Sequence, residues 1–168
     1  MTAESAIASR VLDVLDGLGV AYEVVACDPD FADTAAFCDR YAYPIENCGN
    51  TIIVASRKEP LQYAACIVTG SSRLDVNKTV RRLMGVSRAS FASAEQTMAV
   101  TGMMIGGVTP FALPADVPVY ADEKLMALDY VILGSGTRSS KIRVAPDVIG
   151  RLAGAQTVAG LSMEPGPR

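Results

Sequence analysis

The first twenty residues predict a helix with one apolar face. Apolar side chains recur there at spacings of three and four residues, at Ile7, Val11, Val14, Leu15 and Leu18. Gly19 follows, and glycine is the residue that most often ends a helix. The pattern predicts a helix over about 5–17, and the alternating apolar positions after it predict a strand over 20–26.

Two strongly apolar runs in the first half of the chain predict a β-hairpin. They cover 50–56 and 61–69, and the charged turn 57–60 joins them. Before the hairpin, Asp33 can cap a helix that extends to about Tyr41. We therefore expect a short helix followed by two antiparallel, mostly buried strands.

The second half of the chain alternates helix and strand patterns. A short helix is expected to end at Gly85, and the capping-box sequence 93–96 begins another helix that ends near 101–102. Strands are expected over 117–121, 130–133 and 141–145, and a last helix over 146–152. Because several connections are as short as hairpins, the pattern predicts a mixed α/β sheet. One domain over 1–160 is expected, with a flexible tail over 161–168.

Residues 96–115 form an uncharged stretch of twenty residues, which is long enough in principle to cross a bilayer. The stretch also contains three glycines, two prolines and three threonines. This composition favours a buried, irregular segment over a membrane helix. No membrane partner is expected.

Composition restricts the available chemistry more than the folding pattern does. The chain of 168 residues has no histidine, which excludes the Ser-His-Asp triad, the Cys-His pair and the HExxH zinc site. Its four cysteines, at 27, 38, 48 and 66, contain no CxxC spacing. We expect reduced thiols, no metal and no cofactor. The N-terminus lacks the pattern of a signal peptide, so a cytoplasmic location is expected.

The charge is unevenly distributed along the chain. The net charge is −3, yet residues 73–88 hold five basic residues and one acid, a local balance of +4. Lys78, Arg81 and Arg82 have the spacing of one helix face. That face either contacts nucleic-acid phosphates or is solvated surface, and the pattern alone favours the second slightly.

Two glycine-containing loops are candidates for ligand binding. The loop 134–141 lacks the last glycine of a phosphate-binding motif, and Ile142 stands where that motif needs Ser or Thr. In the loop 106–110, paired glycines between apolar residues allow the main chain to approach another group closely. Each loop either binds a ligand or forms an ordinary turn.

Several motifs together resemble the YbaK/EbsC family of aminoacyl-tRNA deacylases, relatives of the editing domain of bacterial prolyl-tRNA synthetase. The resemblance spans about 5–153, and its most specific part is the family's G-x-x-x-P loop at Gly106–Pro110. The other matching motifs are Thr101-Gly102, Leu113-Pro114, Pro118–Tyr120, Asp122-Glu123, Gly134–Gly136 with Arg138 and Lys141, and Arg73–Asp75 with Lys78.

The resemblance implies a mixed, partly barrel-like sheet surrounded by helices. It also implies trans-acting hydrolysis of the ester on mischarged tRNA, with tRNA(Pro) as the expected tRNA and prolyl-tRNA synthetase as a further partner; no DNA is expected. The catalytic candidates are Asn50, Gly106 and Gly107. The substrate-binding candidates are Val108, Thr109, Pro110, Phe111, Asp122, Gly134, Ser135 and Gly136. The candidates for tRNA contact are Arg73, Lys78, Arg81, Arg82, Arg138 and Lys141.

One position departs from the family pattern. The family usually has an essential lysine before the strand that begins near Thr51, and this chain has Asn50. An amide can donate a hydrogen bond but carries no charge. Lys58, Arg73 and Lys141 are candidates for a replacement cation. Three interpretations follow: an editing hydrolase, a non-catalytic module that binds tRNA or an aminoacyl ligand, and a protein that binds or hydrolyses a small aminoacyl-like metabolite.

Overall fold

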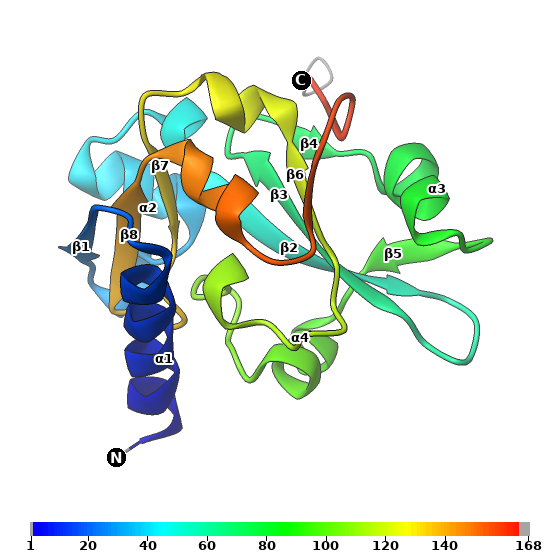
Figure 1. The fold of residues 1–168 in the computed structure, drawn as a ribbon, viewed down its shortest axis with the longest axis horizontal. Helices are drawn as coiled ribbons and strands as arrows, with labels where there is room; N and C mark the ends of the chain where they lie inside the picture. Colours follow the sequence, from blue (N-terminus) through cyan, green and yellow to red (C-terminus); the bar gives the residue numbers. More distant parts are fainter. Residues whose placement is uncertain (1, 165–168) are drawn as a thin grey trace.

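Three open sheets carry the strands in the computed structural model, which describes residues 2–164 (Figure 1). The largest has the order β5 (Ala89–Phe91), β2 (Gly49–Ser56), β3 (Tyr63–Thr69), β6 (Val119–Asp122) and β9 (Ala155–Val158). The second has the order β1 (Tyr22–Ala26), β8 (Ser140–Val144) and β7 (Val131–Gly134), and the third pairs β10 (Ser162–Met163) with β4 (Arg73–Leu74). β6 runs parallel to β3 and β9, and the other pairs are antiparallel. The predicted mixed α/β class is confirmed.

Four α-helices surround the sheets. They are α1 (Ala3–Leu18), α2 (Thr34–Tyr41), α3 (Arg81–Met84) and α4 (Ala94–Thr101), and the π-helical turn η3 (Val76–Val80) leads into α3. Short 3₁₀ helices cover Pro29–Phe31, Ile45–Asn47, Pro110–Ala112, Glu123–Ala127 and Pro146–Arg151. The predicted capping box is present, since Ser93 and Gln96 exchange hydrogen bonds at the start of α4. Within 2–164, no helix has the length and apolar character needed to cross a bilayer.

Apolar side chains pack on both faces of the central sheet. One cluster joins α1 to the central sheet and to β7 and β8, with Leu15, Ile53 and Leu133 among its buried members. The other cluster packs η3 against the opposite face, through Val54 and Val80. Burial of these side chains supplies the main driving force for this arrangement. Strand β2 therefore lies between the two clusters.

One edge of β2 is only partly paired, and this positions the site. β3 pairs with β2 from Gly49 to Ala55 on one side. On the other side, β5 pairs only with Val54–Ser56, and Cys48, just before β2, bridges to Ile132 in β7. The stretch between these two neighbours has no strand partner on that side, so main-chain groups there are available to a ligand.

Several elements differ from the expectations. The sequence pattern missed β4, β5, β9 and β10, which are short and exist through pairing with distant segments. The last helix is 3₁₀ and not α-helical. Part of the expected tail is ordered: Leu161 is fully buried and its carbonyl accepts from the Asp75 N–H at 2.9 Å. The rest of that tail, 165–168, lies outside the described residues.

Candidate active site

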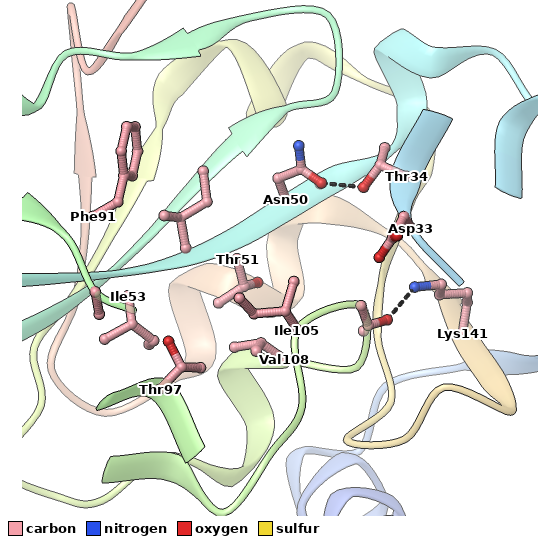
Figure 2. Close-up of a pocket in the computed structure, with 15 residues that line it drawn as sticks. Asp33, Thr34, Asn50, Thr51, Ile53, Phe91, Thr97, Ile105, Val108 and Lys141 are labelled. Carbon is pink, nitrogen blue, oxygen red and sulfur yellow. Dashed lines mark hydrogen bonds between the residues drawn. The ribbon is translucent and has the colours of Figure 1, made fainter. Parts of the chain in front are cut away.

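A pocket of about 470 Å³ lies along the open edge of β2 (Figure 2). Five parts of the fold contribute to its wall: the start of α2, strand β2, the β5–α4 segment, the 105–108 loop, and the ends of β7 and β8. The lining residues are Asp33, Thr34, Gly49, Asn50, Thr51, Ile52, Ile53, Phe91, Ala92, Thr97, Ile105, Gly106, Val108, Gly134 and Lys141. The pocket therefore contains Asn50 and both predicted glycine loops.

Three successive carbonyls of the 105–108 loop are held by other parts of the protein. The Arg138 guanidinium donates to Ile105 O at 2.7 Å, and the Lys141 ammonium donates to Gly106 O at 2.6 Å. The third carbonyl, Gly107 O, accepts from the Gly136 N–H at 2.8 Å. These bonds fix the orientation of the loop, and the loop takes part in them through its main chain alone.

The anchoring of these carbonyls determines where the N–H groups of the loop point. In a planar trans peptide, the N–H points away from the carbonyl of the preceding residue. The Gly107 N–H donates to Met104 O at 2.9 Å. The N–H groups of Gly106 and Val108 have no hydrogen-bond partner within residues 2–164, and both residues line the pocket. Two main-chain donors are therefore available to a ligand.

Glycine is required where the two loops pack against each other. Gly106 has φ +94°, which side chains rarely adopt, and a Cβ at Gly134 would collide with the carbonyl oxygen of Val108. A Cβ at Gly107 would lie 2.8 Å from the Thr137 carbonyl oxygen. The pairing of these loops thus depends on main chain approaching main chain.

Lys141 is the single basic side chain among the pocket-lining residues. It is only 8% exposed, and its ammonium donates to Ala32 O and Gly106 O, both at 2.6 Å (Figure 2). Burial lowers the pKa of Lys141 below its ordinary value, and the nearby Cys27, Cys48 and Asp33 side chains offset part of this lowering. The structure thus shows this ammonium holding two main-chain carbonyls, and the expected contact of Lys141 with tRNA stays a prediction.

Arg138 connects three segments around the pocket. Its guanidinium donates twice to Pro29 O, at 3.1 and 2.8 Å, and it bonds both Ile105 O and the Asp33 carboxylate, the latter at 3.0 Å. Asp33 is the N-cap residue of α2 but makes no side-chain cap bond, because its carboxylate turns to Arg138. Arg138 therefore makes four hydrogen bonds within the protein, and its expected contact with tRNA phosphate stays a prediction.

Asn50 lies on the pocket wall near the start of β2. Its Oδ1 accepts a hydrogen bond from the Thr34 hydroxyl, which leaves the amide NH₂ free to donate (Figure 2). Of the three expected replacement cations, Lys58 and Arg73 do not line the pocket, whereas Lys141 does. The positive charge on the pocket wall therefore comes from Lys141 in β8, whereas the lysine usual in the family would stand at position 50.

Sequence reasoning missed the contribution of Thr51. Ile53 O accepts from the Ala92 N–H at 2.9 Å, so the main chain of Ile53 faces the β5 side of β2. Alternate residues of a strand present their main chain to the same edge, and Thr51 therefore faces the open stretch. Its hydroxyl oxygen is buried and has no hydrogen-bond partner. Thr51 thus adds unpaired polar groups to the pocket wall, which only the strand pairing reveals.

The remaining predicted substrate residues lie behind the pocket wall. Thr109, Pro110 and Phe111 are buried, and the Thr109 hydroxyl caps the 3₁₀ helix that follows it. The Ser135 hydroxyl donates to Ser140 O at 2.8 Å. Like Gly107 and Gly136, these residues hold the loops in place and do not line the pocket.

Asp122 also lies outside the pocket, contrary to expectation. It is buried at the end of β6, where its carboxylate accepts from the Ser162 hydroxyl and from the Lys124 N–H, at 3.2 Å for the latter. The Ser162 bond joins β10 to the central sheet, and the Lys124 bond caps the 3₁₀ helix that follows β6. Asp122 was a substrate-binding candidate, and the structure shows it in these structural contacts instead of on the pocket wall.

The predicted basic face lies on η3 and α3, and its residues do not line the pocket; Figure 1 shows α3 beside β5. Arg73, Lys78, Arg81 and Arg82 are all exposed to solvent, and the Arg81 Nε donates to Asn77 O at 2.9 Å.

The four cysteines are buried thiols, and burial raises the pKa of Cys66 to about 12. No group of three or more potential metal-ligating side chains occurs in the described part of the chain.

The chain matches one protein family over most of its length. Residues 28–152 match the family described as "Aminoacyl-tRNA editing domain". Two curated relatives match over 90 residues each: "Uncharacterized protein YwhH" of Bacillus subtilis (strain 168), 34% identical, and "Putative Cys-tRNA(Pro)/Cys-tRNA(Cys) deacylase EbsC" of Enterococcus faecalis (strain ATCC 700802 / V583), 26% identical. The match covers 54% of this chain in both cases and about half of each relative, 56% and 54%.

Solved structures share the whole fold. A crystal structure of "a putative trans-editing enzyme for prolyl tRNA synthetase" superimposes with a TM-score of 0.78 at 25% identity, covering 95% of this chain and 98% of that chain. The hypothetical protein APE2540 superimposes with a TM-score of 0.81 at 22% identity, covering 92% and 99%. The second match supports the fold alone. Together with the family match, the first supports an editing-domain architecture for this chain.

Proposed function

Because the chain belongs to the aminoacyl-tRNA editing domain family, we propose that it is a trans-acting hydrolase that removes a mischarged amino acid from tRNA(Pro). The observation that carries this proposal is the pair of free main-chain N–H groups at Gly106 and Val108. Both residues line a pocket large enough for an aminoacyl group, and their peptide units are fixed by the carbonyl bonds of the same loop. Preorganised donors of this kind favour ester hydrolysis.

The two N–H groups act on the ester carbonyl oxygen. Water attacks the carbonyl carbon, positioned by the pocket or assisted by a group of the substrate itself, and negative charge develops on that oxygen while the water gives up a proton. Donors already aimed at this position stabilise the charge without reorganising, and one such donor is typically worth about 100- to 1,000-fold in rate. Collapse of the intermediate breaks the bond to the ribose oxygen, which takes up a proton. The products are the free amino acid and the uncharged tRNA.

The side chains around the loop position the substrate and the two N–H donors. Lys141 holds the Gly106 carbonyl and is a positioning residue for the donors. Asn50 orients the ester or the terminal ribose through its free amide N–H groups. The family lysine would offer a charged donor at this point, and charged hydrogen bonds are worth about 1.5–3 kcal/mol against about 1 kcal/mol for neutral ones. Slower turnover than in lysine-containing relatives is the consequence.

The exposed cations outside the pocket bind tRNA. Arg73, Lys78, Arg81 and Arg82 lie within reach of solvent and belong to the segment of charge +4. Phosphate contacts of this kind are salt-dependent, so the chain alone binds tRNA weakly at physiological salt. Prolyl-tRNA synthetase is the proposed source of the mischarged substrate, and the cytoplasm is the proposed location.

A deacylation assay with a panel of tRNA(Pro) species tests the proposal. The panel carries alanine, cysteine, serine, threonine or proline, and release of the amino acid is followed over time. We expect at least one mischarged species to be hydrolysed faster than in buffer, with Pro-tRNA(Pro) spared. If no species is hydrolysed while tRNA still binds, the proposed hydrolase activity is wrong.

A second candidate function is favoured by Asn50. With the family lysine absent, the same pocket would serve as a non-catalytic module that binds aminoacyl-tRNA. Binding of a non-hydrolysable aminoacyl-tRNA analogue together with zero turnover of the matched ester would establish this function. Turnover of any panel member excludes it.

A further inference from the structure

Strand β2 separates two different surfaces at the pocket. Thr51 and Ile53 lie on its inner side, toward Val108 of the 105–108 loop and Thr97 of α4 (Figure 2). Asn50 and Phe91 lie on its outer side in the same view. Side chains alternate along a strand, so Ile52 joins Asn50 on the outer side. The pocket thus has an inner side with Thr51 and Ile53 and an outer side with Asn50, Ile52 and Phe91, which we call the outer shelf of β2.

Phe91 is the prominent feature of this shelf. It is the last residue of the edge strand β5, pairs with Val54, and is 58% exposed although it lines the pocket. An aromatic ring this exposed gains little from folding, since most of its area stays in water. A flat apolar ring beside a pocket is, however, a suitable platform for a nucleic-acid base.

Exposed cations lie at the opposite end of β5 from Phe91. The main chains of Arg57 and Arg88 are joined by a hydrogen bond of 3.1 Å, which brings the hairpin turn next to the start of β5. Arg57, Lys58 and Arg88 are all exposed, and Glu59 is the acid of the same turn. Arg81 donates to Ser87 O at 3.3 Å and so extends this basic surface toward α3. An aromatic platform leading into cations matches the usual design of single-strand binding surfaces.

We propose that the outer shelf of β2 binds the 3′-terminal adenosine of aminoacyl-tRNA, with its base stacked on Phe91 and the preceding phosphates directed toward Arg57 and Arg88. This inference rests on the proposed function and adds the location of the tRNA end. The ester would cross the open edge of β2, with the amino acid on the Thr51 side and the ribose on the Asn50 side. Both Asn50 and Phe91 then contact the nucleoside, not the amino acid.

Fluorescence of a terminal base analogue tests the proposed stack independently of catalysis. A tRNA(Pro) transcript carries 2-aminopurine in place of its last adenine, and this base loses emission when it stacks on an aromatic ring. We expect quenching when wild-type protein is added, and none with Phe91→Ala. Phe91→Ala should also weaken binding about ten-fold, because base–aromatic stacking has this size. Phe91→Trp should retain the quenching.

The matched control is Met163→Ala, which removes a comparably exposed apolar side chain on β10, outside the pocket. It should leave both quenching and affinity unchanged. If the wild type deacylates tRNA but shows no quenching, or if Phe91→Ala quenches like the control, the stack is wrong while the proposed function stands. If tRNA neither binds nor is deacylated at any protein concentration, both proposals are overturned.

The path of the phosphates has its own test. Arg57→Ala with Arg88→Ala should lower the dependence of tRNA affinity on salt by about two phosphate contacts. Lys124→Ala, which removes an exposed cation paired with Glu164, is the control and should leave the slope unchanged. An unaltered slope in the double variant contradicts the proposed path.

Discussion

The cations around the pocket and those beyond β5 have opposite roles in the fold. Lys141 and Arg138 spend their donors on main-chain carbonyls, so they shape the 105–108 loop. Lys78 in η3 and Arg82 in α3 are exposed to solvent and do not line the pocket. The positive charge of this chain is therefore of two kinds, one that shapes the pocket and one that is exposed to solvent.

The largest expected effect comes from disturbing the contact between the two loops. Gly134→Ala would place a methyl group against the Val108 carbonyl and push away the loop that supplies the N–H donors. We expect deacylation to fall by more than 100-fold and the free energy of unfolding to fall by about 3 kcal/mol. Gly150→Ala is the control, because a Cβ there meets nothing within 4 Å. Similar behaviour of the two variants in urea unfolding and deacylation would contradict this role of Gly134.

A smaller but still large effect is expected at Lys141. Lys141→Met fills similar space but leaves the Ala32 and Gly106 carbonyls without their donor. An unsatisfied buried group costs about 1–3 kcal/mol, and the loosened loop should lower kcat by at least ten-fold. Lys124→Met, at an exposed position outside the pocket, should affect stability and kcat little. If kcat is unchanged in Lys141→Met, the loop does not depend on this anchor.

The exposed cations should give a third, intermediate effect that is confined to tRNA. Arg81→Glu with Arg82→Glu should weaken tRNA binding about ten-fold or more at low salt and leave hydrolysis of a short aminoacyl-adenosine ester unchanged. Filter binding over a salt series measures the first, and ester hydrolysis the second. Unchanged tRNA affinity would remove this face from the proposed interface.

Local sequence patterns predicted the elements that are stabilised by nearby residues. The helix that ends at Gly19, the capping box at Ser93 and the hairpin around 57–60 all follow from neighbours in the chain, and the structure confirms each. β9 and β10 were missed because their four and two residues gain stability only from pairing with β6 and β4. Periodicity over so few residues carries little information.

The candidate site likewise combines features that the local sequence predicts with features that depend on distant segments. The glycine loops and Asn50 were identified from the sequence and line or support the pocket. The partners of Lys141 and Arg138 could not be predicted, because Ala32 and Ile105 accept through main-chain carbonyls that any residue possesses. Thr51 was missed for a related reason, since its exposure to the pocket follows from where β5 stops along β2.

The smallest expected effect is a pH dependence that distinguishes the two kinds of cation. Burial lowers the pKa of Lys141 in the folded chain below the ordinary value of 10.5, so the unfolded chain binds more protons between these two pKa values. The free energy of unfolding should therefore rise with pH across that window, and this rise should be missing in Lys141→Met. Urea unfolding from pH 7 to 10.5 measures it as the difference between wild type and variant. Lys78→Met should keep the wild-type slope. A slope that is equal in wild type and Lys141→Met would mean that the ammonium of Lys141 carries no burial cost, and the contrast between anchoring and exposed cations would then rest on hydrogen bonding alone.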